Sequence, residues 1–125
     1  MKEKINRSDM KKHRAFHIDA AAQTVMEVMI EDKHSLDILQ KLVGGYIEVA
    51  VRLDNQDVIY VDEEGLLKKY EVFFEYEGAH QPFAGNGVMV GTNSKGADVD
   101  CKTTLEELKA KIAFYSLEEI RKKYV

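Results

Sequence analysis

The residues with the clearest capacity for chemistry form an acidic cluster near the middle of the 125-residue chain, Asp62-Glu63-Glu64-Gly65. Three adjacent carboxylates before a glycine suggest a calcium loop. A calcium loop, however, carries its acidic ligands at alternating positions, and that alternation is absent here. The cluster is therefore predicted to be an exposed turn, whose carboxylates can receive a cationic group of a partner.

A second group of polar side chains lies in the glycine-rich segment Gly78–Gly87, which also holds the only proline of the chain. His80, Gln81 and Asn86 are good hydrogen-bonding groups, and loops between the strands of a rigid sheet are common binding positions. Pro82 and the glycines serve turn geometry equally well. The Gly-Asn-Gly tripeptide leads into an expected strand instead of a helix, so it is not a dinucleotide-binding motif.

No other combination of residues points to catalysis or to a metal centre. His17 and Asp19 lie two residues apart on an expected strand, where they could bind a metal or share a proton, but a solvated polar face is far more common. Cys101 is the only cysteine, which excludes an internal disulfide and a cysteine-only metal site. No base can be assigned to its thiol. The sequence therefore predicts no catalytic residues, no metal and no cofactor, although distant residues could still converge in an active site.

The net charge of −4 is distributed unevenly along the chain. Residues 1–14 carry a charge of +4, residues 15–101 carry −10 and residues 102–125 carry +2. An acidic body repels phosphates, which disfavours nucleic acid as the partner of the central sheet. The basic ends can contact the acidic body within or between subunits, so a homo-oligomer is expected. A nucleic-acid-binding arm is the alternative role for residues 1–14.

At 125 residues and 14.3 kDa, the chain is long enough for one domain whose hydrophobic core needs no disulfide. No apolar stretch approaches the ~20 residues that cross a bilayer, so no membrane contact is expected. The N-terminus is basic but lacks the apolar core of a signal peptide. These features predict a cytoplasmic protein with a basic N-terminal extension, residues 1–14, and a single domain, residues 15–125.

Six segments rich in β-branched and aromatic residues, bounded by turn formers, are expected to be strands. A short helix, Leu36–Val43, interrupts them, and Gly44 suits the left-handed residue that ends it. Capping boxes at Thr104 and Ser116 open one or two C-terminal helices. The order predicts an α+β fold with a mostly antiparallel sheet of about six strands and one short inserted helix. The expected strands are residues 15–20, 24–30, 46–53, 58–61, 72–76 and 88–92.

The hairpin formed by residues 46–61 positions the acidic cluster. Ile47, Val49 and Val51 occupy alternate positions of its first strand and are predicted to share the buried face. Leu66 and Leu67, which follow the acidic cluster, are expected to return to the core.

Three motifs, LVGGYIE, VDEEGLLK and QPFAGNGVMVG, resemble in their order and spacing a family of small proteins found largely in phages, prophages and bacteria. The resemblance runs from about Ala15 to Phe114. The family is catalogued as a domain of unknown function. The resemblance therefore implies a setting among phages or mobile elements and transfers no catalytic residues.

These features favour a small accessory binding protein. Its binding surface is predicted where the turn Asp62–Glu64 and the loop His80–Asn86 meet, provided that both lie at one end of the sheet. The partner is expected to be a protein with a cationic segment or a small polar ligand. The alternatives are a small enzyme whose site is assembled from distant residues, a structural or assembly protein, or two unrelated turns.

Overall fold

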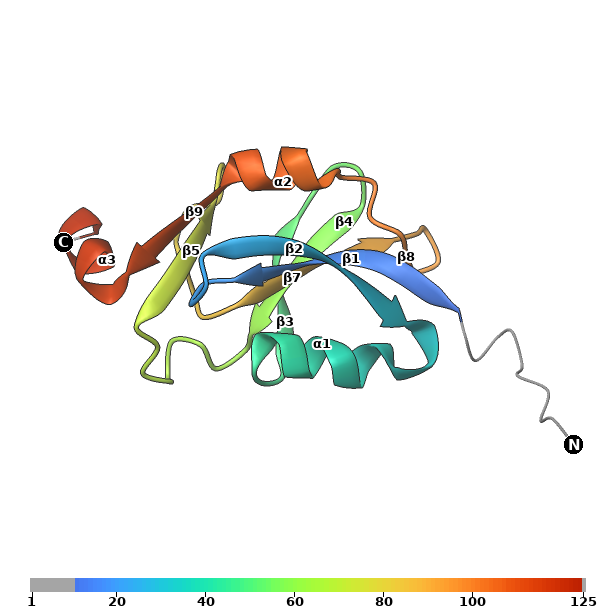
Figure 1. Cartoon of the computed structure of the whole chain (residues 1–125), viewed down its shortest axis with the longest axis horizontal. Helices are drawn as coiled ribbons and strands as arrows, with labels where there is room; N and C mark the ends of the chain where they lie inside the picture. Colours follow the sequence, from blue (N-terminus) through green and yellow to red (C-terminus); the bar gives the residue numbers. More distant parts are fainter. Residues whose placement is uncertain (1–10, 125) are drawn as a thin grey trace, which may run out of the picture.

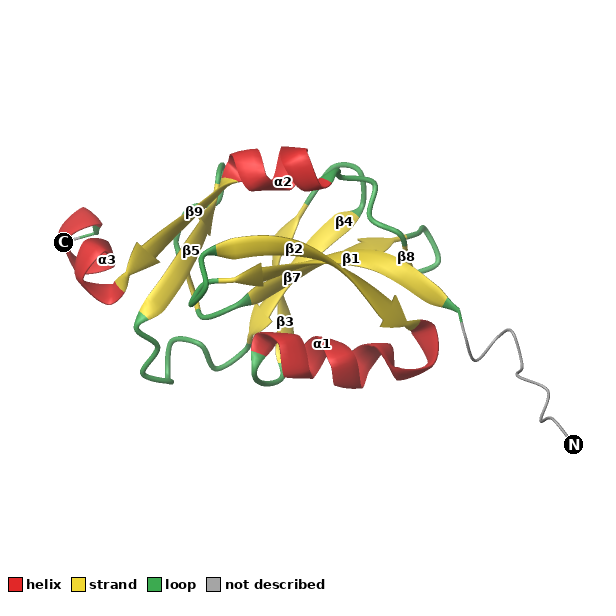
Figure 2. Ribbon diagram, viewed as in Figure 1, coloured by secondary structure: helices red, strands yellow, loops and turns green. Residues whose placement is uncertain are grey.

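Two antiparallel sheets form the framework of the protein, and the computed structural model describes residues 11–124 (Figures 1 and 2). Sheet A has six strands in the order β2-β1-β7-β4-β3, with β8 paired to β7 outside that path, and sheet B has the order β6-β5-β9. The strands of sheet A are β1 (Lys12–Asp19), β2 (Thr24–Glu31), β3 (Ile47–Arg52), β4 (Asp57–Asp62), β7 (Gly87–Thr92) and β8 (Asp98–Val99). Those of sheet B are β5 (Val72–Tyr76), β6 (Phe83–Ala84) and β9 (Ile112–Ser116).

The helices lie where the sequence places them. They are α1 (Ser35–Val43), α2 (Leu105–Lys111) and α3 (Leu117–Lys123), and a 3-10 turn at Asp32–His34 precedes α1. Gly44 ends α1 with φ 86°, and capping boxes open α2 and α3, as the sequence predicts. The α+β class, the six-stranded antiparallel sheet, the inserted helix and two C-terminal helices are thus confirmed.

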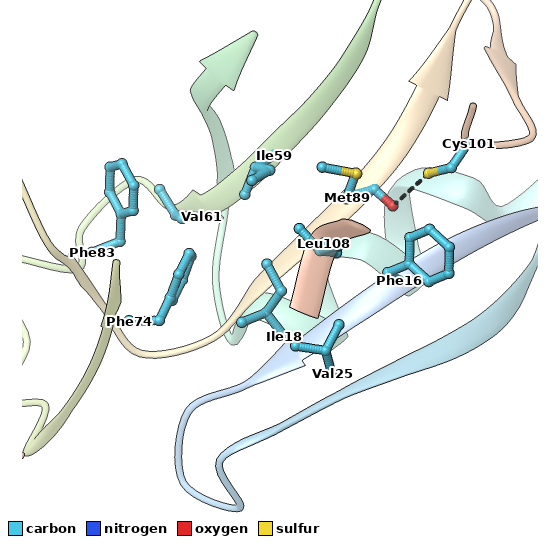
Figure 3. Close-up of a cluster of buried hydrophobic side chains, with 10 residues drawn as sticks. All are labelled: Phe16, Ile18, Val25, Ile59, Val61, Phe74, Phe83, Met89, Cys101 and Leu108. Carbon is cyan, nitrogen blue, oxygen red and sulfur yellow. Dashed lines mark hydrogen bonds between the residues drawn. The ribbon is translucent and has the colours of Figure 1, made fainter. Parts of the chain in front are cut away.

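Sheet A lies between α1 on one face and sheet B with α2 on the other, so both of its faces are buried. Alternate residues of β7 illustrate this arrangement: Val88 and Val90 face α1, whereas Met89 faces sheet B and α2. Figure 3 shows the cluster on the second face, where Phe74 of β5 and Leu108 of α2 meet the sheet. The buried members of that cluster are Phe16, Ile18, Val25, Ile59, Val61, Phe74, Phe83, Met89, Cys101 and Leu108.

The three-stranded sheet B was not predicted. Its strand β9 follows α2 directly, and all five of its residues are half-buried. Buried and exposed positions therefore do not alternate along β9. Strand β6 contains only two residues, which is too short for a pattern to emerge. Strand β6 pairs with one side of β5 and β9 pairs with the other. Both strands form because of this tertiary pairing, which the local sequence does not predict.

The expected facing of the central hairpin is wrong. Strand β3 pairs with β4 in one register up to Val49 and in another from Val51, so Ala50 is an extra residue, a β-bulge. The bulge exchanges the two faces: Ile47 packs on the α1 side, whereas Val51 packs on the side of sheet B. Val49 is 37% exposed instead of buried.

Residues 12–14 of the expected N-terminal extension form the beginning of β1. Lys12 begins β1, and Arg14 is tied to the body of the domain, since its guanidinium donates to the carbonyl of Cys101 at 2.6 Å. Residues 1–10 of the expected extension lie outside the described residues. In the described part of the chain, no helix has the length and apolar character needed to cross a membrane.

A buried carboxylate joins the hairpin to the chain before α2. Asp57 is fully buried, and its carboxylate accepts hydrogen bonds from the backbone N–H groups of Lys102 and Thr103 and from the Thr103 hydroxyl. The shortest of these, from the hydroxyl, is 2.6 Å. The carboxylate of Asp57 therefore accepts the hydrogen bonds of all three of these donors.

Asp57→Ala is expected to lower the free energy of unfolding by about 3 kcal/mol, because it leaves several buried donors without an acceptor. The exposed Asp54 in the same turn supplies the control, and Asp54→Ala should change stability by no more than about 0.5 kcal/mol. Urea denaturation measures both values. Equal losses in the two variants would show that the Asp57 clamp has no special role.

Candidate binding surface

The first carboxylate of the acidic cluster is a structural group. The Asp62 side chain is 1% exposed and accepts hydrogen bonds from Lys68 Nζ at 2.7 Å, from the Tyr70 hydroxyl at 2.7 Å and from the Glu64 backbone N–H at 2.9 Å. Burial would raise the pKa of Asp62, but these hydrogen bonds outweigh burial and hold the pKa below its ordinary value. Lys68 also donates to the carbonyl of Gly44 at 3.0 Å, so the network fastens the acidic turn to the end of α1.

Two leucines project from the turn that Asp62 fastens. Successive turn hydrogen bonds, from Leu67 N–H and Lys68 N–H to the Glu64 carbonyl, keep the segment tight. Leu66 is 84% exposed and Leu67 is 82% exposed. The expectation that they return to the core is therefore wrong. Because Asp62 binds Lys68 and Tyr70, the chain between them is held as a projecting loop, and the next fully buried side chain is Phe74.

A groove runs beside the edge strand β3. It consists of a hollow of about 850 Å³ and a smaller one of about 170 Å³ that share the lining residues Ala50, Gln81 and Phe83. One wall is the segment Glu48–Asn55. The other wall is formed by residues 76–84 and by the projecting loop that carries Leu66 and Leu67, which we call the leucine loop. We call this feature the edge groove. Val49, Leu66 and Leu67 all line its smaller hollow, so we refer to these three residues as the apolar patch.

The predicted site residues are distributed over four places. Asp62, Glu63 and Gln81 line the smaller hollow, so the acidic turn and the glycine-rich loop do approach each other there. His80 lines the larger hollow together with Gln81. Glu64 is exposed but lines neither hollow. Asn86 lies at the start of β7, where its side-chain oxygen accepts from the Ala20 N–H at 2.9 Å, an interaction that joins β7 to the end of β1.

The charge of the edge groove is acidic. Its lining includes Glu48, Asp54 and Glu63, and no described basic side chain forms an ion pair with any of the three. Glu77 is paired with Lys111 at 3.3 Å. Arg52 is the single Lys or Arg residue that lines either hollow. The groove thus offers carboxylates to a positively charged partner.

Sequence reasoning missed the apolar patch. Alternation with Ile47 predicts a buried Val49, but Val49 lies on an edge strand and is 37% exposed. The apolar character of Leu66 and Leu67 predicts a place in the core, whereas the structure exposes both side chains. Their position between an acidic turn and the Lys68-Lys69 pair was the available sign of a surface loop.

The other chemically capable residues have structural partners. Cys101 is buried and donates to the Met89 carbonyl at 3.3 Å, and burial, assisted by the Asp57 carboxylate, raises the pKa of its thiol to about 12 (Figure 3). His17 Nε2 lies 3.2 Å from the Leu42 carbonyl, and Asp19 accepts from a turn N–H. Among residues 11–124, no three His, Cys, Asp or Glu side chains come together in a group that could hold a metal ion.

Comparison with known proteins identifies one family. A family model described as "Domain of unknown function (DUF3846)" matches residues 11–113, which confirms the expected resemblance to an uncharacterised domain family and extends it to β1. No curated protein and no solved structure matches the chain.

Asp62→Asn is expected to lower the free energy of unfolding by about 2 kcal/mol at neutral pH, because the neutral amide accepts weaker hydrogen bonds from Lys68 and Tyr70. The pKa of Asp62 is depressed by folding, so its contribution is present above the unfolded value, about 4, and is lost as the pH falls through the folded value. Stability measured between about pH 5 and about pH 2 should therefore fall more steeply in the wild type.

Tyr70→Phe is the graded control for this prediction. It removes one of the three donors and leaves the carboxylate, so the acid-side loss should be smaller than in the wild type but still present. If the wild type and Asp62→Asn lose stability in parallel below about pH 5, the hydrogen bonds to Asp62 do not stabilise the turn.

Proposed function

The chain belongs to the family described as a domain of unknown function (DUF3846), and we propose that it is a small accessory protein that works by binding a protein partner. The observation that carries this proposal is the exposure of two adjacent leucines, 84% and 82%, at the mouth of an acidic groove. Each leucine side chain is stabilised by about 1.5–3 kcal/mol when it leaves water. Neither Leu66 nor Leu67 obtains that stabilisation within the described domain.

The composition of the loop supports binding by contact with a partner. Turns ordinarily carry polar residues and glycine, and single exposed apolar residues are common on any surface. Here Val49 and the two leucines line the same hollow, whose lining also includes the carboxylates of Glu48 and Glu63. A contiguous apolar area with a polar rim is typical of a protein-binding site.

The charges of the rim support a basic partner. Glu48 and Glu63 line the smaller hollow beside the apolar patch, and Asp54 lies farther along the groove. A segment with apolar side chains flanked by Lys or Arg would bury the patch and meet these carboxylates. The same charges oppose nucleic acid, whose phosphates they would repel. Opposite charges also accelerate encounter between the two proteins.

The motifs LVGGYIE and VDEEGLLK support a setting in phages or other mobile elements, where such a protein would act in the cytoplasm on a protein of the host or of the element. In that setting a small acidic protein needs no chemistry of its own, since occupying a surface of its target is enough. A homodimer formed through the basic chain ends stays a prediction, which light scattering at low and high salt can test.

A small polar ligand is the second candidate for the same groove. The larger hollow, about 850 Å³, falls in the size range of ligand sites, and His80 and Gln81 offer donors and acceptors around it. This alternative assigns no role to Leu66 and Leu67, so the two candidates differ in which substitutions abolish binding.

The double variant Leu66→Ser/Leu67→Ser is expected to lose the protein partner while its stability changes by no more than about 0.5 kcal/mol, because both side chains are exposed. The control is Leu36→Ser, since Leu36 is also an exposed leucine, 56%, but lies on α1. Tagged versions of the three proteins are expressed in the native cells, and the co-purifying proteins are quantified by mass spectrometry.

The expected result is a discrete protein recovered with the wild type and with Leu36→Ser and absent from the double variant. Retention of that protein by the double variant would refute the proposed docking surface. Recovery of a small molecule by all three proteins, with no protein partner, would favour the ligand alternative instead.

A further inference from the structure

Strand β3 forms an edge of sheet A, since β4 is its single pairing partner in the described part of the chain. Two backbone hydrogen bonds at the ends of the β3–β4 ladder show which of its residue pairs are hydrogen-bonded pairs. Glu63 N–H donates to the Tyr46 carbonyl at 2.8 Å, and Leu53 N–H donates to the Asp57 carbonyl at 2.9 Å. These two residue pairs are therefore hydrogen-bonded pairs of the antiparallel ladder.

The order of hydrogen-bonded and non-hydrogen-bonded pairs determines which backbone groups of β3 are free of β4 and available to another strand. Hydrogen-bonded and non-hydrogen-bonded pairs alternate along an antiparallel ladder. Ile47 and Val49 consequently occupy non-hydrogen-bonded positions before the bulge, and Arg52 occupies one after it. The N–H and C=O groups of these three residues point away from β4, toward the open edge, where they can pair with another strand.

The edge groove follows most of this open edge. Its two hollows together are lined by every residue from Glu48 to Asn55. The opposite edge of sheet A, β2, adjoins a hollow of about 320 Å³ that reaches only the strand's beginning, Thr24–Met26. The edge strand β6 of sheet B has two residues. The other edge of sheet B, β9, adjoins that same hollow only at Ile112 and Phe114. Of these edges, β3 has the most continuous groove, which is lined by five of its six residues, Glu48–Arg52.

We propose that the partner binds by strand addition: an extended segment of it pairs with the outward-facing groups of β3 and places alternate side chains in the edge groove. This inference rests on the proposed function, because it specifies how the protein partner engages the same surface. Strand addition takes its affinity from main-chain hydrogen bonds and its specificity from the pockets that receive alternate side chains.

The groove specifies the chemistry of the added strand. Ala50 and Phe83, which both hollows share, offer an apolar floor to the side chains that point inward, and the apolar patch extends that floor at one end. Glu48, Glu63 and Asp54 offer carboxylates to basic side chains at the rim. The occupant is therefore a segment of about six residues in which apolar residues alternate with Lys or Arg.

The same features oppose pairing with a second copy of the chain. Two β3 edges in contact would double the carboxylates of the groove, Glu48, Asp54 and Glu63, against one lining Arg or Lys residue, Arg52, in each copy, and this excess of like charge opposes the pair. A bulge and charged side chains are also the usual protection of an edge strand against unspecific pairing. Here they leave the edge open to a strand of opposite charge.

A random dodecapeptide library displayed on yeast provides the test, with the full-length protein as the selecting target. The enriched peptides should show apolar residues alternating with Lys or Arg. Two versions of the best peptide are then made, one methylated on its odd-numbered and one on its even-numbered backbone nitrogens. Only one of these two sets of N–H groups faces β3, so one version should bind at least about tenfold more weakly than the unmethylated peptide. Hydrogen exchange measured by NMR should slow at Ile47, Val49 and Arg52 when the peptide is bound.

Val49→Pro with the control Val49→Thr tests the same point on the protein. Proline removes an outward-facing N–H that is not bonded to β4. Threonine keeps that N–H and changes only the side chain, so Val49→Thr measures the contribution of the apolar patch, and Val49→Pro should bind the peptide at least about tenfold more weakly than Val49→Thr. If the proline variant does not fold, the methylated peptides give the answer on the wild-type chain.

The outcomes separate this inference from the proposed function. One outcome is that peptides tolerate methylation of either set of backbone nitrogens but fail to bind the double variant Leu66→Ser/Leu67→Ser. That outcome overturns strand addition and leaves the proposed docking surface in place. Peptides indifferent to every one of these changes overturn both proposals. Selection that enriches no peptide, or a dimer of the protein that forms through β3, also overturns strand addition.

Discussion

The carboxylate of Asp62 is the constraint on which the surface of this protein depends. It accepts three hydrogen bonds from residues on both sides of the leucine loop, and its partner Lys68 reaches back to Gly44 at the end of α1. A carboxylate that is 1% exposed requires such partners, because burial without them would favour its neutral form. The need to satisfy one buried charge thus determines where the chain projects, and Leu66 and Leu67 lie on that projection.

The sequence predicted the elements whose cause is local. Gly44 as the end of α1, the capping boxes at Thr104 and Ser116 and the order of the long strands all follow from residue type and spacing. Sheet B forms because β6 and β9 pair with β5, and the bulge at Ala50 forms where β3 pairs with β4. Both features depend on pairing between separate strands, so no local sequence pattern predicts them. For the candidate site, the proximity of Glu63 and Gln81 was anticipated, whereas the buried state of Asp62 depends on Tyr70, eight residues away.

The bulge connects the fold to the proposed function. The extra residue in β3 brings Ala50 and Val51 to the side of sheet B, where both line the edge groove. Val49, which precedes the bulge, is 37% exposed and lines the smaller hollow with the two leucines. The acidic residues of the groove add selectivity to that apolar contact, because they favour a basic partner and oppose both phosphates and a second acidic chain. The resulting surface has the components of a docking site and needs no catalytic group.

Photo-crosslinking in the native cells tests the central claim most directly. A photoreactive amino acid replaces Leu67 in one version of the protein and Leu36, an exposed leucine on α1, in another. Leu67 in the apolar patch should give a discrete adduct with a single protein, and Leu36 should give none. An adduct formed from position 36 and absent from position 67 would contradict the account, because the partner would then bind on the α1 face of the molecule.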